Sequence, residues 1–265
     1  MILFQSVLSF RVNCAILMIS YFTLKTKRKI AIVIMNIHGF TKTTLLDYPG
    51  HTAATIFTGN CNLRCPFCHN YDLVLNPEVF PKEDDELILA FLKKRFGILK
   101  GVCITGGEPT LQHDLAEYIG RIKDIGYKVK LDTNGFNPDV LLSLIDNKLI
   151  DYAAIDIKAG HDNYAKASGL PQINLKPLEE SISILSKNSI DYEFRTTAVK
   201  GIHTDADFED ISTWLPGDCR YFIQNYNKTD GIGDMLCESF DSSSLNHFLD
   251  IVKPHIPLSS LRGVD

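Results

Sequence analysis

Three cysteines close together form the part of this sequence that is best suited to chemistry. Cys61, Cys65 and Cys68 have a CxxxCxxC spacing, and thiolates are soft ligands that suit an iron–sulfur cluster or zinc. A structural zinc site normally takes four protein ligands, but the other cysteines are scattered and supply no second CxxC pair. Three thiolates on a cubane cluster would leave one iron open, which is what catalysis needs. A zinc site with a distant fourth ligand is the alternative.

Four further polar motifs lie downstream of the cysteines. The first has two adjacent glycines, which let a backbone approach a ligand closely, and a carboxylate suited to an ammonium group. The others contain acids, a lysine and an arginine, which need partners because burying an unpaired charge is expensive. The residues are Gly106, Gly107 and Glu108 in TGGEPT, Asp132, Thr133 and Asn134 in LDTNG, Asp156 and Lys158 in DIK, and Arg195 in EFRTT. Ordinary turns, a surface Asp156–Lys158 pair and a structural ion pair of Arg195 are the alternatives.

Strand-like and helical segments alternate from residue 36 onward, which is typical of βαβ units and a parallel sheet. We expect strands over 52–58, 101–105, 127–132, 152–157, 192–199 and 221–225. We expect helices over 83–96, 111–125, 138–146, 178–187, 205–214 and 243–252, with Asn137 and Thr204 as N-caps. These units predict an α/β fold, a partial (open) TIM-type (β/α)6 barrel. Each polar motif falls at the carboxyl end of a strand, where such barrels place their chemistry.

Composition narrows the class of protein. The chain has 265 residues, 45% of them hydrophobic, which excludes a disordered chain or a disulfide miniprotein. A net charge of −5 and the lack of a large basic block predict no nucleic-acid partner. The odd number of cysteines, seven, fits a metal site in a reducing compartment better than a disulfide framework. We therefore expect a cytoplasmic protein.

The first 34 residues are predicted to be separate from a domain over 35–265. Residues 2–22 are long enough to span a bilayer, but Arg11 near their centre makes insertion marginal. No charge precedes the apolar run, which disfavours a secretory signal. Three interpretations stay open: a true start at Met35, a weak membrane anchor within residues 1–24, or a packed extension of the fold. Basic residues at 25–29 would leave the rest of the chain in the cytoplasm even after insertion.

The cysteine spacing after the first strand of a partial barrel resembles that of the radical S-adenosylmethionine (radical SAM) superfamily. LLDYPG at 45–50, FTGN at 57–60 and CHN at 68–70 resemble the proteins that activate anaerobic ribonucleoside-triphosphate reductase. The resemblance covers about residues 36–265, and residues 1–34 have no counterpart in it. It implies a barrel of the radical SAM kind and an oxidoreductase that generates a glycyl radical on a partner enzyme.

The resemblance also implies cofactors and their ligands. A [4Fe-4S] cluster would bind Cys61, Cys65 and Cys68, and S-adenosylmethionine would chelate the open iron. The GGE motif would contact the methionine amino group, Lys158 would lie near the methionine carboxylate, and Phe67 would pack by the adenine or only in the loop core. The implied cofactor-binding set is Phe67, Cys68, His69, Gly106, Gly107, Glu108, Asp132, Thr133, Asn134, Asp156, Lys158 and Arg195. As in a related activase, Asp132, Thr133 and Asp156 would also hold a monovalent cation.

The implied partners are the glycyl radical subunit of anaerobic ribonucleotide reductase and reduced flavodoxin or ferredoxin as electron donor. Two other functions stay open. One is a radical SAM enzyme that acts on a small molecule, such as a 7-carboxy-7-deazaguanine synthase, which the continuous match through DTNG, DIK and EFRTT disfavours. The other is a non-catalytic metal-binding protein, with or without a membrane tether.

Overall fold

The computed structural model describes residues 35–227 and 237–263. The predictions made for residues 1–34 lie outside these residues. In the described part of the chain, no helix is both long and apolar enough to cross a membrane.

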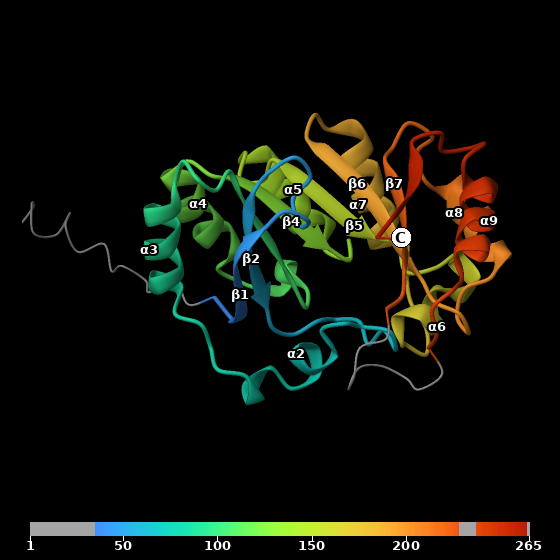
Figure 1. Ribbon diagram of the computed structural model, residues 1–265, viewed down its shortest axis with the longest axis horizontal. Coiled ribbons are helices and arrows are strands. Elements are labelled where there is room, and N and C mark those ends of the chain that lie inside the picture. Colours follow the sequence, from blue (N-terminus) through green and yellow to red (C-terminus); the bar gives the residue numbers. More distant parts are fainter. Residues whose placement is uncertain (1–34, 228–236, 264–265) are drawn as a thin grey trace, which may run out of the picture. The chain divides into compact units, whose positions relative to one another are not determined.

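Within the described residues, one sheet of eight strands forms the framework (Figure 1). The strands lie side by side in chain order; β1 is antiparallel to β2, and every later pair is parallel. The carboxyl ends of β2 to β8 therefore meet at one edge, where the loops of a barrel-type sheet carry its site. The strands are β1 (Ile37–Thr44), β2 (Ala53–Thr58), β3 (Gly101–Gly106), β4 (Lys128–Thr133), β5 (Tyr152–Asp156), β6 (Asp191–Ala198), β7 (Tyr221–Asn225) and β8 (Ser259–Arg262).

Helices fill the connections between the parallel strands. In Figure 1, α3 and α4 lie beside the first strands, and α8 and α9 lie beside the last ones. Leu115, Ile119 and Ile122 are fully or almost fully buried and share one face of α4, as their spacing predicts. The helices are α2 (Tyr71–Leu75), α3 (Asp85–Arg95), α4 (Leu115–Ile125), α5 (Pro138–Asp146), α6 (Tyr164–Ser168), α7 (Lys176–Lys187), α8 (Asp205–Trp214) and α9 (Ser242–Val252).

The six predicted strands are confirmed as β2 to β7, and the predicted fold class is confirmed with them. The sequence analysis missed β1 and β8, which extend the sheet at its two ends. Only the first two residues of β1 are buried, and β8 has four residues with the sequence SSLR. Neither has an apolar run, so pairing with a neighbouring strand, rather than local sequence, defines them. Helices α2 and α6, of five residues each, were missed because they are too short to show a period.

The two predicted N-caps have different outcomes. Thr204 is confirmed: it forms a capping box with Asp207, whose carboxylate accepts from the Thr204 N–H at 2.9 Å. Asn137 lies at the predicted N-cap position of α5, but its side chain makes no capping hydrogen bond. Its amide donates instead to Oγ1 of Thr110 at 2.7 Å, and Pro138 begins the helix. Asn137 thus ties the start of α5 to the turn that contains Glu108.

Candidate metal and cofactor site

The loop that carries Cys61, Cys65 and Cys68 is called the cysteine loop here. One cavity lies where this loop covers the carboxyl ends of β3 to β6. All the predicted site residues except Arg195 line it. The lining residues are Cys61, Leu63, Cys65, Phe67, Cys68, His69, Asn70, Val74, Thr105, Gly106, Gly107, Glu108, Asp132, Thr133, Asn134, Asp156, Lys158 and Thr197. The cysteine motif and all four polar motifs, EFRTT through Thr197, therefore meet around one space.

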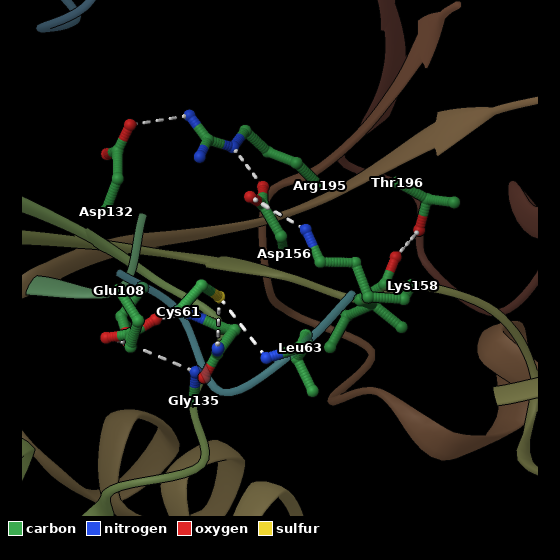
Figure 2. Close-up of polar contacts among 12 residues, drawn as sticks. Cys61, Leu63, Glu108, Asp132, Gly135, Asp156, Lys158, Arg195 and Thr196 are labelled. Carbon is green, nitrogen blue, oxygen red and sulfur yellow. Dashed lines mark hydrogen bonds and ion pairs between the residues drawn. The ribbon is translucent and has the colours of Figure 1, made fainter. Parts of the chain in front are cut away.

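Hydrogen bonds fix the shape of the cysteine loop. The Leu63 N–H donates to Sγ of Cys61 at 3.4 Å, and the Cys68 N–H donates to the Cys65 carbonyl at 3.1 Å. The side-chain amide of Asn134 approaches Sγ of Cys61 at 3.8 Å (Figure 2 shows the setting of Cys61). Backbone and side-chain donors near a cysteine sulfur are contacts that tune a cluster held by thiolates.

Neighbouring segments hold this loop by close backbone packing. Asn60, the residue before the first cysteine, has a positive φ of 67°, and its carbonyl accepts from the Glu108 N–H at 2.7 Å. A Cβ on Gly107 would lie 1.8 Å from that carbonyl oxygen, so only glycine fits there. On the other side, a Cβ on Gly169 would lie 1.9 Å from the Arg64 carbonyl oxygen. The sequence analysis assigned the two GGE glycines to a ligand's close approach; at Gly107 the approach is made by the chain's own backbone.

Burial keeps the three cysteine side chains neutral in the protein alone. It raises the pKa of Cys61 and of Cys68, and it raises the pKa of Cys65 to about 12. The ammonium of Lys158 works in the opposite direction on all three thiols. Binding of a metal to these thiols would therefore release protons, with Lys158 as the nearby positive charge that favours thiolates.

Glu108 is only 1% exposed, and protein donors surround its carboxylate. Oε1 accepts from the Thr110 N–H at 3.0 Å, the Thr110 hydroxyl at 2.6 Å and the Thr133 hydroxyl at 2.7 Å, and Oε2 accepts from the Asn134 N–H at 2.7 Å. Burial raises the pKa of Glu108, while these hydrogen bonds favour the ionised form. The carboxylate thus fastens the turn after β3 to the turn after β4.

A chain of ion pairs links the ends of β4, β5 and β6 (Figure 2). It joins Asp132, Arg195, Asp156 and Lys158, and these four residues are called the floor of the site. Arg195 donates from Nη1 to Asp132 at 3.2 Å and from Nε to Asp156 at 2.9 Å, and Lys158 donates to the second oxygen of Asp156 at 3.3 Å. Burial works to raise the pKa of Asp156, but Arg195 and Lys158 outweigh it and hold that pKa well below its usual range. The pKa of Lys158 is raised, since Asp156 and the thiols outweigh the opposing effect of burial.

The other predicted site residues have definite neighbours. Arg195 does not line the cavity; it steadies the two acids that do, which was one of the roles considered for it. Phe67 is 5% exposed and packs edge-on against His203, with ring centres 6.0 Å apart, in the core of the loop. His69 stacks on Tyr226 at 5.6 Å, and its Nε2 lies 3.1 Å from a backbone carbonyl at residue 227.

Sequence reasoning missed Lys130 and His203. Lys130 is 1% exposed and pairs with Asp132 from two residues upstream, a spacing that puts both side chains on one face of β4. That alternation was a usable signal. His203 is 4% exposed, and its Nε2 lies 2.8 Å from the Lys158 carbonyl. No local signal pointed to it, because the loop after β6 brings it to the end of β5 only in the folded chain.

The donor set of the cavity fits an iron–sulfur cluster. Three thiols face one space beside a lysine, and backbone and amide donors lie near a sulfur. Among the described residues, no three His, Cys, Asp or Glu side chains meet closely enough to hold a single metal ion. A cubane takes each thiolate on a different iron, so its three cysteines need not converge on one point.

Comparisons with known proteins agree with this chemistry. The family described as the Radical SAM superfamily matches residues 55–215. A protein of Methanocaldococcus jannaschii, provisionally named a glycyl-radical enzyme activating enzyme, is 36% identical over 200 residues, which cover 73% of this chain and 81% of that protein. A second protein of that organism with the same provisional name is 29% identical over 188 residues, covering 66% of this chain and 67% of its own length.

The fold is also found in a solved structure. Streptococcus suis SuiB bound to its precursor peptide SuiA superposes with a TM-score of 0.63 at 15% identity. The match covers 79% of this chain but 48% of SuiB, so the chain spans about half of that protein's length. At this identity the likeness concerns the fold alone.

Proposed function

This chain belongs to the radical SAM superfamily, whose members use a [4Fe-4S] cluster and S-adenosylmethionine, and we propose that it activates a glycyl-radical enzyme. The observation that carries the proposal is that one cavity collects the three motif cysteines together with Gly106, Asp156 and Lys158. Relatives provisionally named as glycyl-radical enzyme activating enzymes support this partner class. Within that class, the LLDYPG, FTGN and CHN segments favour anaerobic ribonucleotide reductase as the partner.

The residues of the cavity have separate roles in this proposal. Cys61, Cys65 and Cys68 would hold the cluster, which when bound supplies one electron that cleaves the sulfonium of S-adenosylmethionine into methionine and a 5′-deoxyadenosyl radical. Lys158 would bind the methionine carboxylate; in support, it lines the cavity, and Asp156 is its single carboxylate partner among the described residues. The Gly106 carbonyl, which already accepts from Asn70 at 2.9 Å, presents a backbone acceptor for the methionine ammonium.

Exclusion of water is the second task of the site. Leu63, Phe67 and Val74 line the cavity and are each no more than 5% exposed, so apolar side chains lie next to the thiols. A primary carbon radical must be kept from stray C–H donors until it takes a hydrogen atom from the partner's glycine. The electron would come from reduced flavodoxin or ferredoxin, which keeps the overall reaction balanced.

Anaerobic reconstitution of the full chain with iron and sulfide tests the proposal. We expect bound iron and sulfide, 5′-deoxyadenosine formed with a reductant and S-adenosylmethionine, and a glycyl radical EPR signal on added anaerobic ribonucleotide reductase. A reductase whose radical-bearing glycine is replaced by alanine is the control and should give no signal.

The outcomes separate the alternatives. Deoxyadenosine without a radical on the reductase would reject this partner and favour another glycyl-radical enzyme or a small-molecule substrate. A protein that binds zinc and neither iron nor sulfide after oxygen-free reconstitution would overturn the enzyme assignment.

A further inference from the structure

The two acids on the floor of the site have all four carboxylate oxygens bound by cationic groups of this chain. In Asp132, Oδ1 pairs with the ammonium of Lys130, and Oδ2 accepts from Arg195 at 3.2 Å. In Asp156, Oδ1 accepts from Arg195 at 2.9 Å and Oδ2 accepts from Lys158 at 3.3 Å. Each of the four oxygens therefore already has a positively charged partner. An oxygen that binds Na⁺ or K⁺ usually has only neutral neighbours besides the ion.

Lys130 is the least accessible of these cations. Its side chain is 1% exposed, against 13% for Arg195 and 18% for Lys158. Beyond Asp132, its ammonium faces the ring of Tyr152 at 5.9 Å and Sγ of Cys103 at 4.0 Å. A buried ammonium persists only with a close anionic partner, so Lys130 and Asp132 hold each other in place.

Thr133, the third member of the expected cation site, is turned away from the acids. Its hydroxyl donates to Glu108 at 2.7 Å and accepts from the Gly135 N–H at 3.1 Å. The expectation that Asp132, Thr133 and Asp156 share a monovalent cation therefore does not fit this arrangement.

The charges that pair directly at the two acids lead to the same conclusion. Three cations, Lys130, Arg195 and Lys158, pair with the two anions Asp132 and Asp156. The neighbouring Glu193 is paired through both oxygens with Arg262 at 2.8 Å, and this pair adds no net charge. A further cation at these acids would lie beside three cationic groups that already bind their oxygens, and those groups would repel it.

We propose that the Lys130 ammonium takes the place of a monovalent metal cation beside Asp132 and Asp156, so that this chain binds S-adenosylmethionine without added Na⁺ or K⁺. The proposal rests on the function proposed above. Lys130 is a positioning residue in this account: it holds Asp132, which holds Arg195 against Asp156 and thereby keeps Lys158 in the cavity.

The test compares salts at equal ionic strength. Affinity of the reconstituted full chain for S-adenosylmethionine is measured by calorimetry in choline, sodium and potassium chloride, and thermal unfolding of the purified chain is measured in the same three salts. For the unaltered protein we expect dissociation constants that agree within about twofold and equal unfolding temperatures. Affinity that rises fivefold or more with Na⁺ or K⁺ would overturn the proposal.

Lys130→Ala supplies a readout that a merely structural lysine would not give. It leaves Asp132 without its buried partner and leaves space where a small cation fits, so in choline chloride we expect an unfolding temperature lower by roughly 10 °C. Affinity for S-adenosylmethionine should fall at least tenfold, and K⁺ or Na⁺ should restore part of both losses. Losses that are the same in all three salts would reject the cation-like role of Lys130.

Two further variants keep the result interpretable. The double change Lys130→Met with Asp132→Asn removes both charges, and we expect it to fold without any preference among the salts. Lys123→Ala breaks a lysine–aspartate pair with Asp151 outside the cavity, and its affinity should match that of the unaltered protein in every salt. If the reconstituted chain binds no S-adenosylmethionine in any salt, the proposed function fails, while the unfolding temperatures of Lys130→Ala still decide the role of Lys130.

Discussion

At the scale of single residues, the site combines side chains with very different tasks in a small space. Cys61, Cys65 and Cys68, the proposed cluster ligands, are thiols whose pKa values burial raises, and Lys158 is the cation that opposes that effect. The carboxylate of Glu108, by contrast, accepts hydrogen bonds from protein donors. In the proposed site, the GGE motif thus has two tasks: Gly106 binds the ligand, and Glu108 holds the loops together.

Replacing Cys65 by alanine should remove function without unfolding the protein. One sulfur is lost from a nearly buried side chain, so we expect an unfolding temperature within a few degrees of the original for the chain without iron. Formation of 5′-deoxyadenosine should disappear, because two thiolates cannot hold the cluster in place. Cys219→Ala, at a buried cysteine that does not line the cavity, is the matched control and should keep its iron. Deoxyadenosine formation by the Cys65 variant would contradict the ligand assignment.

Glu108→Gln should weaken the fold as well as the site. A glutamine amide can accept at one position only, so some of the Thr110, Thr133 and Asn134 donors lose their acceptor. We expect the free energy of unfolding to fall by about 1–3 kcal/mol, measured by urea titration. Glu117→Gln on the exposed face of α4 is the control, with no expected change. An unchanged urea midpoint for the Glu108 variant would show that these hydrogen bonds make no net contribution to the free energy of unfolding.

At the scale of elements, loops and helices from distant parts of the chain position the cysteine loop. His203, in the turn before α8, joins the end of β5 to that loop. The Val199 N–H donates to its Nδ1 at 3.0 Å, so Nε2 carries the proton and donates to the Lys158 carbonyl at 2.8 Å. The same ring packs against Phe67, the residue before the third cysteine. One neutral imidazole therefore contacts both the Lys158 carbonyl and the cysteine loop.

Stability should depend on the protonation of His203. Burial lowers its pKa below the ordinary value near 6.5, so the unfolded chain takes up a proton more readily than the folded one. The resulting destabilisation is absent well above pH 6.5. It grows as the pH falls from 6.5 toward the lower pKa that His203 has in the folded protein. His203→Phe keeps a ring against Phe67 but removes the protonation of residue 203. The unfolding temperature of this variant should therefore vary less between pH 7.5 and 5.5 than that of the unaltered protein. The control is His247→Phe on the exposed part of α9; equal pH dependence in the His203 variant and the unaltered protein would contradict the prediction.

At the scale of the whole domain, the order of the sheet brings its motifs together. Because β2 to β8 are parallel neighbours, segments separated by more than a hundred residues end at the same edge. The same order links charged side chains of β4, β6 and β8, because Arg195, which pairs with Asp132, also lies 4.0 Å from Glu193, the partner of Arg262. The described fold begins at Met35, which is 1% exposed and whose N–H donates to Asp85 at 2.8 Å.

A chain that begins at Met35 should fold and keep its activity. Its terminal ammonium would lie at the position of the present N–H, next to the Asp85 carboxylate, whose pKa burial raises in the full chain. An ion pair there should keep the unfolding temperature equal to or above that of the full chain. Asp85→Asn in the shortened protein removes the pair and should lower that temperature. Loss of solubility or of deoxyadenosine formation in the shortened chain would show that residues 1–34 belong to the functional protein.

The sequence alone predicted the strand–helix alternation and the strand ends that carry DTNG and DIK, because these depend on short spacings and local periodicity, and its cysteine spacing is the basis for proposing Cys61, Cys65 and Cys68 as the cluster ligands. It did not determine β1 and β8, whose few buried residues give no local signal, or the true role of Asn137. The tertiary structure was needed to show which polar groups meet: Lys130 with Asp132, Arg195 with both acids, and His203 with the Lys158 carbonyl. The contacts of Arg195 and His203 join separate strands and loops, and pairing of that kind depends on sheet order and loop packing, which local sequence does not encode; the Lys130–Asp132 pair lies within β4, but only the fold shows that it is buried beside Arg195.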